Sequence, residues 1–215
     1  MIAETTTTTT LQLGNVLFWF TLVAVAVSAI SGVLIAGKNH FDLFGMIVIA
    51  LATALGGGSL RDMLLNKHVF WIHNQLFLIV ALCAGVATFF YARRYRYSLK
   101  LFLIPDAMGL ATFSLAGTMS ALSSGAPWLV ASFMGVITGV AGGIIRDTMC
   151  NEIPIVFKST LYATISLFGG LVFIALIRLG FDIALSASVA GILIFVVRLA
   201  AIRWGLSLPV FNARE

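Results

Sequence analysis

The strongest constraint on this chain is a series of apolar stretches, each about 20 residues long, that recurs along nearly its whole length. A helix of that length crosses a bilayer core of about 30 Å. Only 10% of the 215 residues are charged, whereas a soluble domain carries about 25%. The stretches are continuous rather than alternating, which argues against an outer-membrane barrel. The sequence therefore predicts an all-α, polytopic membrane protein.

Polar or basic breaks divide the chain into seven predicted spans. They cover about residues 12–36, 41–66, 74–92, 101–122, 127–150, 159–178 and 182–204. Because the loops are short, we expect sequential helices to pack as neighbours. The spans would form a single transmembrane domain over residues 1–205, followed by a tail at 206–215. The Thr tract at residues 5–10 is expected to be an unstructured lead.

The distribution of Lys and Arg predicts how the spans are oriented. The side that holds the N-terminus carries only Lys67 and Arg178. The opposite side carries eight basic residues: Lys38, Arg93, Arg94, Arg96, Lys100, Lys158, Arg203 and Arg214. Because basic loops stay in the cytoplasm, we expect a plasma (inner) membrane protein with its N-terminus outside and its C-terminus cytoplasmic. The basic loop at residues 93–100 is also expected to attract anionic membrane lipids.

An internal repeat organises the chain. In the second span, Gly56, Gly57 and Gly58 precede Arg61 and Asp62. A shift of 85 residues (146 − 61 = 85) aligns this segment without a gap to the fifth span. The matching residues there are Gly142, Gly143, Arg146 and Asp147, and the same shift places Asn66 on Asn151. A charged pair that recurs after glycines in one register indicates two related units.

Each predicted unit contains three spans, at about residues 12–92 and 101–178, and the span at 182–204 has no counterpart. An odd number of spans makes the second unit enter the membrane from the opposite face. The fold class is therefore an inverted repeat of two three-helix units, related by a pseudo-twofold axis in the membrane plane, plus one appended helix.

The two glycine clusters have two interpretations. Glycine lets the backbone leave helical geometry, and the carbonyls freed by a break must then face protein or water in a cavity. Alternatively, small residues let helices approach closely. We favour breaks at residues 56–58 and 142–143, because charges follow at once, and close packing for Gly32, Gly85, Gly117, Gly169 and Gly170. Broken spans at matching positions of inverted repeats indicate a polar pathway.

The arginines and aspartates of both motifs are costly inside a membrane, so they should pair within the bundle. Adjacent residues do not share a helix face. We therefore expect a crossed arrangement in which Arg61 approaches Asp147 and Arg146 approaches Asp62. The alternative is that these residues lie near the headgroups and extend toward water.

Asp106 is a lone carboxylate in the fourth span, where the first repeat has Thr21. It is either a cation contact or the cap of a helix, and the sequence favours neither. The hydroxyls of Ser28, Ser31, Ser114, Thr118 and Ser120 either line a path or bond to backbone carbonyls, and for each one alone the second role is favoured.

The sequence offers no arrangement of residues for enzymatic chemistry. It contains no nucleophile with a base, no Walker motif and no dinucleotide fingerprint. The three histidines have no companions at metal-ligand spacing, so neither a metal nor a cofactor is expected. Because the basic residues gather at helix ends, the formal net charge of +5 is attributed to topology, and no nucleic-acid partner is expected.

At its two motifs the chain resembles prokaryotic members of the trimeric intracellular cation (TRIC) channels, which overlap bacterial membrane proteins described as glycine transporters. The resemblance rests on Gly56-Gly57-Gly58-x-x-Arg61-Asp62 and Gly142-Gly143-x-x-Arg146-Asp147, and it covers about residues 14–205. It implies a homotrimer with a pore in each protomer for potassium and other monovalent cations. It also implies kinks at both glycine clusters, and it assigns these motif residues to the pore. The second kink would be milder, because Ala141 stands where the first cluster has Gly56.

Three functions are consistent with these observations. The first is a passive cation channel in which carbonyls freed at the breaks replace part of an ion's hydration shell. The second is a secondary transporter of a small amino acid such as glycine, because broken helices in inverted repeats also build carriers. A structural or assembly protein without a permeant is the third.

Overall fold

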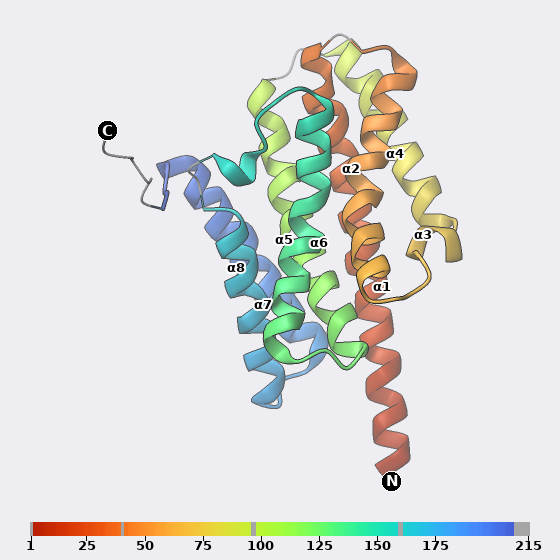
Figure 1. Cartoon of the computed structure of the whole chain (residues 1–215), viewed down its shortest axis with the longest axis vertical. Coiled ribbons are helices and arrows are strands. Elements are labelled where there is room, and N and C mark those ends of the chain that lie inside the picture. The colour runs from red at the N-terminus through yellow and green to blue at the C-terminus, as the bar shows by residue number, and fades with distance from the viewer. Residues whose placement is uncertain (1, 40, 96–97, 159–160, 209–215) are drawn as a thin grey trace.

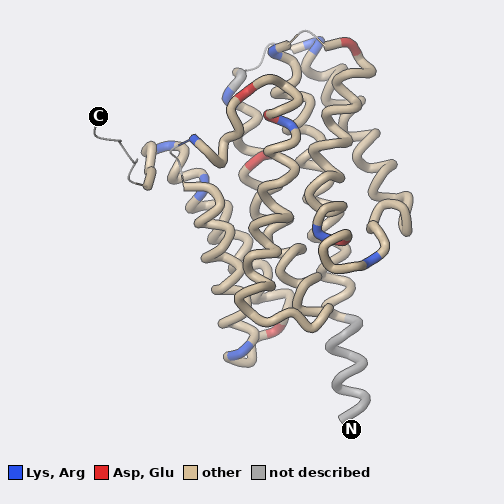
Figure 2. Tube along the Cα trace, in the orientation of Figure 1, with Lys and Arg blue, Asp and Glu red and all other residues tan. Residues whose placement is uncertain are grey.

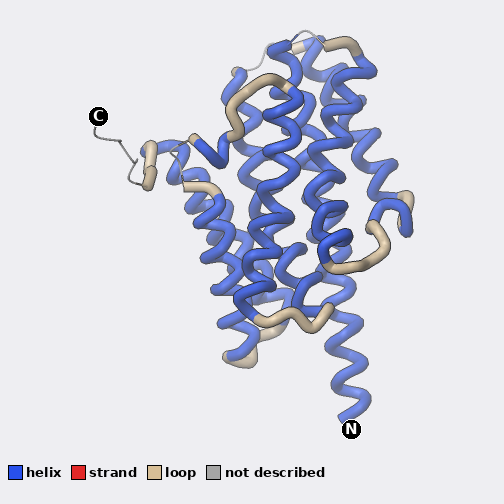
Figure 3. Tube along the Cα trace, viewed as in Figure 1, coloured by secondary structure: helices blue, strands red, loops and turns tan. Residues whose placement is uncertain are grey.

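A computed structural model describes residues 2–39, 41–95, 98–158 and 161–208, and nearly all of them are helical (Figure 3). The α-helices are α1 (Ile2–Ala36), α2 (Leu43–Leu64), α3 (Phe70–His73), α4 (Leu76–Arg94), α5 (Leu103–Ser123), α6 (Trp128–Met149), α7 (Ala163–Arg178) and α8 (Ile183–Trp204). Three short 3-10 turns, at Gly37–Asn39, Leu99–Phe102 and Ile155–Phe157, lie between them.

The predicted fold class is confirmed, and the count of seven spans is approximate. Six helices, α1, α2, α4, α5, α6 and α8, are long and apolar enough to cross a membrane, whereas α7 has only 16 residues. The predicted sixth span starts too early, since α7 begins at Ala163 and residues 159–160 lie outside the described part. The Thr tract belongs to α1 rather than to an unstructured lead. Arg96, Arg214 and residues 209–215 of the predicted tail also lie outside the described residues.

Helices α1, α2, α5 and α6 form the centre of the bundle (Figure 1). Each of these helices packs against its repeat counterpart, α1 against α5 and α2 against α6, as a twofold axis between them requires. Helix α4 covers one side of this centre, and α7 and α8 cover the other. We call the end of the bundle at which α6 ends the upper end, and the end at which α2 ends the lower end.

Local signals set where several helices begin and end. The carboxylate of Asp42 accepts a hydrogen bond from Gly45 N at 2.7 Å and caps α2. Asp182 Oδ2 caps α8 by accepting bonds from the backbone of Ala184 and Leu185 at 2.8 and 3.3 Å. Beyond the ends of α2 and α6, Asn66 and Asn151 adopt φ of 52° and 54°, the left-handed conformation that ends a helix. The two repeats therefore stop their second helices in the same way.

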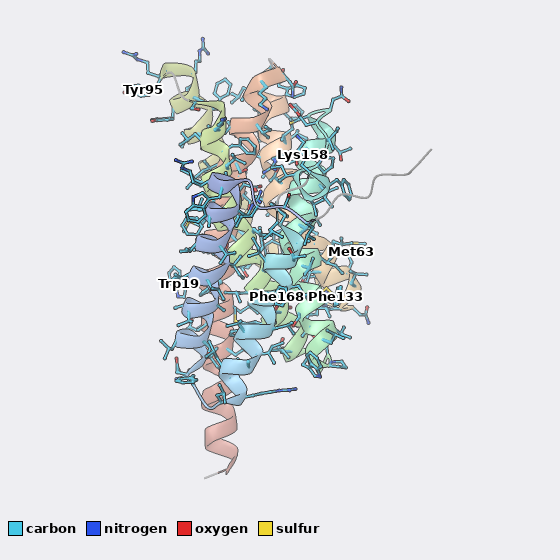
Figure 4. The ribbon with its side chains drawn as sticks, turned by 90° about the vertical axis from the view of Figure 1, so that its left-hand side faces the viewer. Trp19, Met63, Tyr95, Phe133, Lys158 and Phe168 are labelled. Carbon is cyan, nitrogen blue, oxygen red and sulfur yellow. The ribbon has the colours of Figure 1, made fainter. Side chains whose placement is uncertain are left out.

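Charged residues gather toward the two ends of the bundle, and few lie between them (Figure 2). Side chains that face outward from the bundle include Trp19, Met63, Phe133 and Phe168, which are 51–69% exposed (Figure 4). An outer surface of this kind suits contact with lipid or with other copies of the chain. The buried charged side chains that remain inside the bundle therefore define the candidate site.

Two buried arginine clusters as the candidate functional site

Helices α2 and α6 are continuous through both glycine clusters, so the predicted breaks are wrong. The glycines instead let the two helices touch through their backbones. A Cβ added at Gly57 would overlap the carbonyl oxygen of Thr138, and one added at Gly142 would overlap that of Thr53. These contacts are related by the 85-residue shift (138 − 53 = 85). Close approach through small residues, the alternative given above, is what the structure shows at this crossing.

The lower cluster is built around Arg61, in the last turn of α2. Its Nε donates to Asp62 Oδ1 at 2.7 Å, and its guanidinium lies 5.5 Å from the ring centroid of Phe70. Asp62 Oδ2 accepts from the backbone N of Phe70 at 2.9 Å. Both charged residues are only 3% exposed. The aspartate therefore joins its neighbouring arginine to the start of α3.

The upper cluster repeats this design at the end of α6. Arg146 Nε donates to Asp147 Oδ1 at 2.8 Å, and Asp147 Oδ2 accepts from the backbone N of Ile155 at 2.9 Å. The arginine is 1% exposed and the aspartate 2%. Phe70 and Ile155 are again 85 residues apart (155 − 70 = 85). A side chain and a loop that are placed identically in both repeats confirm the register of the repeat.

The crossed pairing predicted between the two motifs is wrong, because each arginine pairs with the aspartate that follows it. The antiparallel helices α2 and α6 cross near residues 55 and 140, and each arginine lies six residues beyond its crossing point, in opposite directions. At 1.5 Å per residue the two arginines are separated by about 18 Å along the bundle. A bound loop holds each aspartate where the long arginine side chain can fold back onto it.

Asp106 completes the upper cluster from α5. Its Oδ1 accepts from Arg146 Nη1 at 2.6 Å, and the same nitrogen donates to Ser31 Oγ at 2.6 Å. Tyr162 Oη donates to Asp106 Oδ1 at 3.4 Å. Within the described part of the chain no side chain caps the start of α5, and Asp106 is instead an ion-pair partner of Arg146. Arg146 also lies 5.4 Å from the ring centroid of Phe102.

The hydroxyls singled out in α5 bond mainly to the backbone of their own helix. Ser114 Oγ donates to Leu110 O at 2.5 Å, and Thr118 Oγ1 donates to Ser114 O at 2.9 Å. Ser114 Oγ also lies 2.6 Å from Ser166 Oγ of α7, inside the bundle. Each of these hydroxyl oxygens keeps a lone pair that could accept a further bond. They lie below the upper cluster, along α5.

The loops that follow α2 and α6 differ in charge at matching positions. Lys67 Nζ donates to Ser120 O at 3.0 Å and to Ser123 Oγ at 3.1 Å, at the end of α5. Its counterpart, Glu152, instead pairs with Lys38 at 3.3 Å. Burial and the nearby Arg61 charge lower the pKa of Lys67 from its ordinary value. The lower end therefore holds two neighbouring cations, where the upper end holds additional carboxylates.

The upper cluster is closed and has unused bonding capacity. A hollow beside Asp147 and Tyr162 is too narrow for a water molecule. Among the described residues, neither Asp106 Oδ2 nor Arg146 Nη2 has a hydrogen-bond partner. Both atoms belong to residues that are at most 5% exposed. Unsatisfied buried charge of this kind is costly, which makes the cluster a candidate for ion or ligand contact.

Sequence reasoning identified the charges of both clusters but not all of their partners. The contacts missed are the rings of Phe70 and Phe102 and the hydroxyl of Tyr162. Comparison of the repeats could have flagged Tyr162, because the aligned residue is Phe77 (162 − 85 = 77). A hydroxyl present in only one of the two aligned residues, together with the pairing of Thr21 with Asp106, signals that the two clusters differ.

Fold and site together define a multi-pass membrane protein built from an inverted three-helix repeat with a buried arginine cluster at each end. The chain belongs to the family described as Glycine transporter, which matches it twice, at residues 18–93 and 103–178. These segments are offset by 85 residues (103 − 18 = 85), the shift found in the motifs.

Related proteins share nearly the whole chain. The UPF0126 inner membrane protein YadS of Escherichia coli K12 is 44% identical over 92% of this chain and 97% of its own length. A UPF0126 membrane protein of Vibrio cholerae is 41% identical over 92% of this chain and 83% of its own. The match therefore includes both clusters and the appended helix.

Solved structures place the fold with the TRIC channels. The TRIC trimeric intracellular cation channel orthologue from Rhodobacter sphaeroides has a TM-score of 0.84 at 31% identity, covering 89% of this chain and 99% of that one. A second TRIC cation channel has a TM-score of 0.81 at 30% identity, covering 91% and 97%. The resemblance to TRIC channels drawn from the two motifs is confirmed.

Proposed function

We propose that this protein is a monovalent cation channel of the inner membrane, mainly for potassium, with one path in each protomer of a homotrimer. The observation that carries the proposal is the pair of buried Arg–Asp clusters at opposite ends of a bundle that superposes on TRIC cation channels. In this structure the hollow beside Asp147 and Tyr162 is too narrow for a water molecule, so we propose that the upper end is closed. Because the helices are unbroken, the path is not lined by carbonyls freed at glycine breaks.

The path runs beside the contact between Gly57 and Gly142 and connects the two clusters. Its ligands would be carboxylate and hydroxyl oxygens, including those of Asp106, Ser114 and Thr118, which replace part of a cation's hydration shell. Arg61 and Arg146 place positive charge across the path, so a cation passes only when each guanidinium moves aside. The neighbouring aspartates would then face the ion without their arginine partner.

Orientation follows from charge. The described basic residues of the upper end, Lys38, Arg93, Arg94, Lys100, Lys158 and Arg203, outnumber Lys67 and Arg178 of the lower end. The positive-inside rule then places the upper end and the C-terminus in the cytoplasm and the N-terminus outside. The Arg146 cluster would be the cytoplasmic gate and the Arg61 cluster the outer one.

Single-channel recording of the purified chain in planar bilayers tests this proposal. We expect discrete potassium currents, and a reversal potential in a KCl gradient that indicates cation selectivity. Asp106→Asn should weaken that selectivity, whereas Asp42→Asn, which changes an exposed helix cap at the same end, should not. Trimeric protein that gives no currents over the accessible voltage range would overturn the channel.

A carrier for a small zwitterionic amino acid is the second candidate. Asp106 Oδ2 and Arg146 Nη2 are both unpartnered among the described atoms, and they could receive the ammonium and carboxylate groups of glycine. Saturable uptake of labelled glycine into liposomes, lost in both Asp106→Asn and Arg146→Gln and unaccompanied by discrete currents, would favour this candidate. Potassium currents without glycine uptake would exclude it.

A further inference from the structure

The helix outside the repeat makes a direct connection to the upper cluster. Arg198 of α8 is 1% exposed, and its guanidinium lies 4.6 Å from the ring centroid of Tyr162. Tyr162 in turn contacts Asp106, which holds Arg146. A continuous line of side chains therefore runs from the appended helix to the arginine.

The same helix also holds the backbone that carries the tyrosine. Arg198 Nη1 donates to Leu161 O at 2.7 Å, and Leu161 N donates to Leu206 O, just beyond the end of α8, at 3.0 Å. Leu161, the residue before Tyr162, is thus bound at its C=O by Arg198 of α8 and at its N–H by the segment that follows α8. Any displacement of α8 relative to α5 and α6 must move Tyr162.

The described residues of the lower end form no equivalent connection. The residue aligned with Tyr162 is Phe77, which has no hydroxyl and packs against Phe18 and Phe70 at ring-centroid distances of 5.5 and 5.0 Å. The residue aligned with Asp106 is Thr21, and α8 has no counterpart. Among the aligned residues, only the second repeat therefore combines Tyr162 and Asp106, and it does so next to Arg198 of α8. This joint occurrence suggests that the three residues act together.

We propose that Arg198 and Tyr162 are positioning residues through which α8 holds Asp106 against Arg146 and keeps the upper end closed. Arg198 fixes the tyrosine ring by a cation–π contact and fixes its main chain by a hydrogen bond. Tyr162 shares the Asp106 oxygen that accepts from Arg146, so it limits the positions available to that carboxylate. Release of the ring by α8 frees Asp106 and loosens the cluster. The consequence for gating rests on the channel proposed above.

Cys150 gives a readout of this closure that does not depend on ion flow. It lies four residues after Arg146 (150 − 146 = 4), at the end of α6, and is 2% exposed. With Cys83→Ala as the background, the labelling rate of Cys150 by a small maleimide reports local opening at the upper end. The variants to compare are Arg198→Leu, Arg198→Lys, Tyr162→Phe and the double change Arg198→Leu with Tyr162→Phe.

Loss of a desolvated cation–π contact should raise the labelling rate of Arg198→Leu about tenfold. Tyr162→Phe, which removes a single hydroxyl and keeps the packing, should raise it in the same direction. The double variant should label no faster than the faster single variant, and Arg198→Lys should stay near the wild-type rate. Arg178→Leu is the matched control, because it removes an arginine 5.9 Å from the Trp128 ring at the lower end.

The same variants in planar bilayers should show a higher open probability, with Arg178→Leu unchanged. Wild-type labelling rates in folded Arg198→Leu and Tyr162→Phe proteins would overturn the proposal, as would effects of the two changes that simply add. If the variants change Cys150 labelling as expected but neither they nor the wild type conducts, the proposed channel function is wrong and the positioning role is supported. If the wild type conducts and labelling does not change, the positioning role fails alone.

Discussion

In the first repeat, buried Arg61 has one carboxylate partner and an aromatic ring, whereas in the second, Arg146 has two carboxylates, a serine hydroxyl and an aromatic ring. The shared part is fixed by the second helix of each repeat and the loop that follows it. The parts that differ come from the neighbouring segments, where Thr21 is aligned with Asp106 and Phe77 is aligned with Tyr162. The repeat thus places each arginine alike, while single side-chain differences give the two ends different sets of partners.

The largest test of this difference is to remove each arginine in turn. Arg146→Met leaves two buried carboxylates unpaired, and Arg61→Met leaves one. Breaking a buried pair costs about 3–5 kcal/mol, so we expect Arg61→Met to fall in that range and Arg146→Met to cost clearly more. Unfolding in detergent, followed by tryptophan fluorescence, measures both. Equal losses would show that the additional partners of Arg146 contribute nothing to stability.

The glycine crossing should respond equally in the two halves. Gly57→Ala and Gly142→Ala each force a methyl group into a carbonyl of the facing helix. Overpacking of this kind costs about 1–3 kcal/mol, and the two losses should agree within error. Gly14→Ala, in α1 where a Cβ meets no atom within 4 Å, is the control and should be neutral or slightly stabilising. A loss at only one of the two crossing glycines would contradict the twofold arrangement.

A smaller and equally symmetric effect is expected at the helix ends. Asn66 and Asn151 have positive φ, which an alanine adopts at a cost of about 1 kcal/mol. Asn66→Ala and Asn151→Ala should therefore lower the free energy of unfolding by that amount each, and the glycine variants should not. Different values for the two sites would mean that one loop is stabilised mainly by other contacts, such as the bond of its aspartate.

The smallest expected effect is specific to the lower end. The pKa of Lys67 is lowered in the folded protein by burial and by Arg61, whereas the unfolded chain titrates near 10.5. Between the two values the unfolded state holds more protons, so this lysine makes stability rise with pH across that window and fall as pH drops through the folded pKa. Lys67→Gln should flatten the dependence of the unfolding midpoint on pH between the lowered pKa of the folded state and 10.5. If the unfolding midpoints of the wild type and of Lys67→Gln depend equally on pH, this contribution of Lys67 is excluded.

The architecture could be predicted from the sequence because its main signals occur more than once. Apolar length gave the spans, and one 85-residue shift gave the inverted repeat and marked Arg61, Asp62, Arg146 and Asp147. The predictions of helix breaks and of crossed ion pairs were wrong, because both depend on how the helices pack. Helix continuity through Gly57 and the separation of the clusters follow from how α2 and α6 cross, which no local pattern encodes. The pairing of Asp106 with Arg146 joins residues 40 positions apart on different helices, so it required the tertiary fold.

At Gly57 and Gly142 the two helices touch through their backbones, since each glycine meets a carbonyl of the other helix, and any rotation of one helix on the other would turn about this contact. A change in the crossing angle about this contact would separate the helices at both ends at once, which gives a continuous passage. A tilt of one helix over the contact would widen one end while narrowing the other, which gives access from alternate sides. Which of these two motions the helix contact allows would therefore distinguish a channel from a carrier.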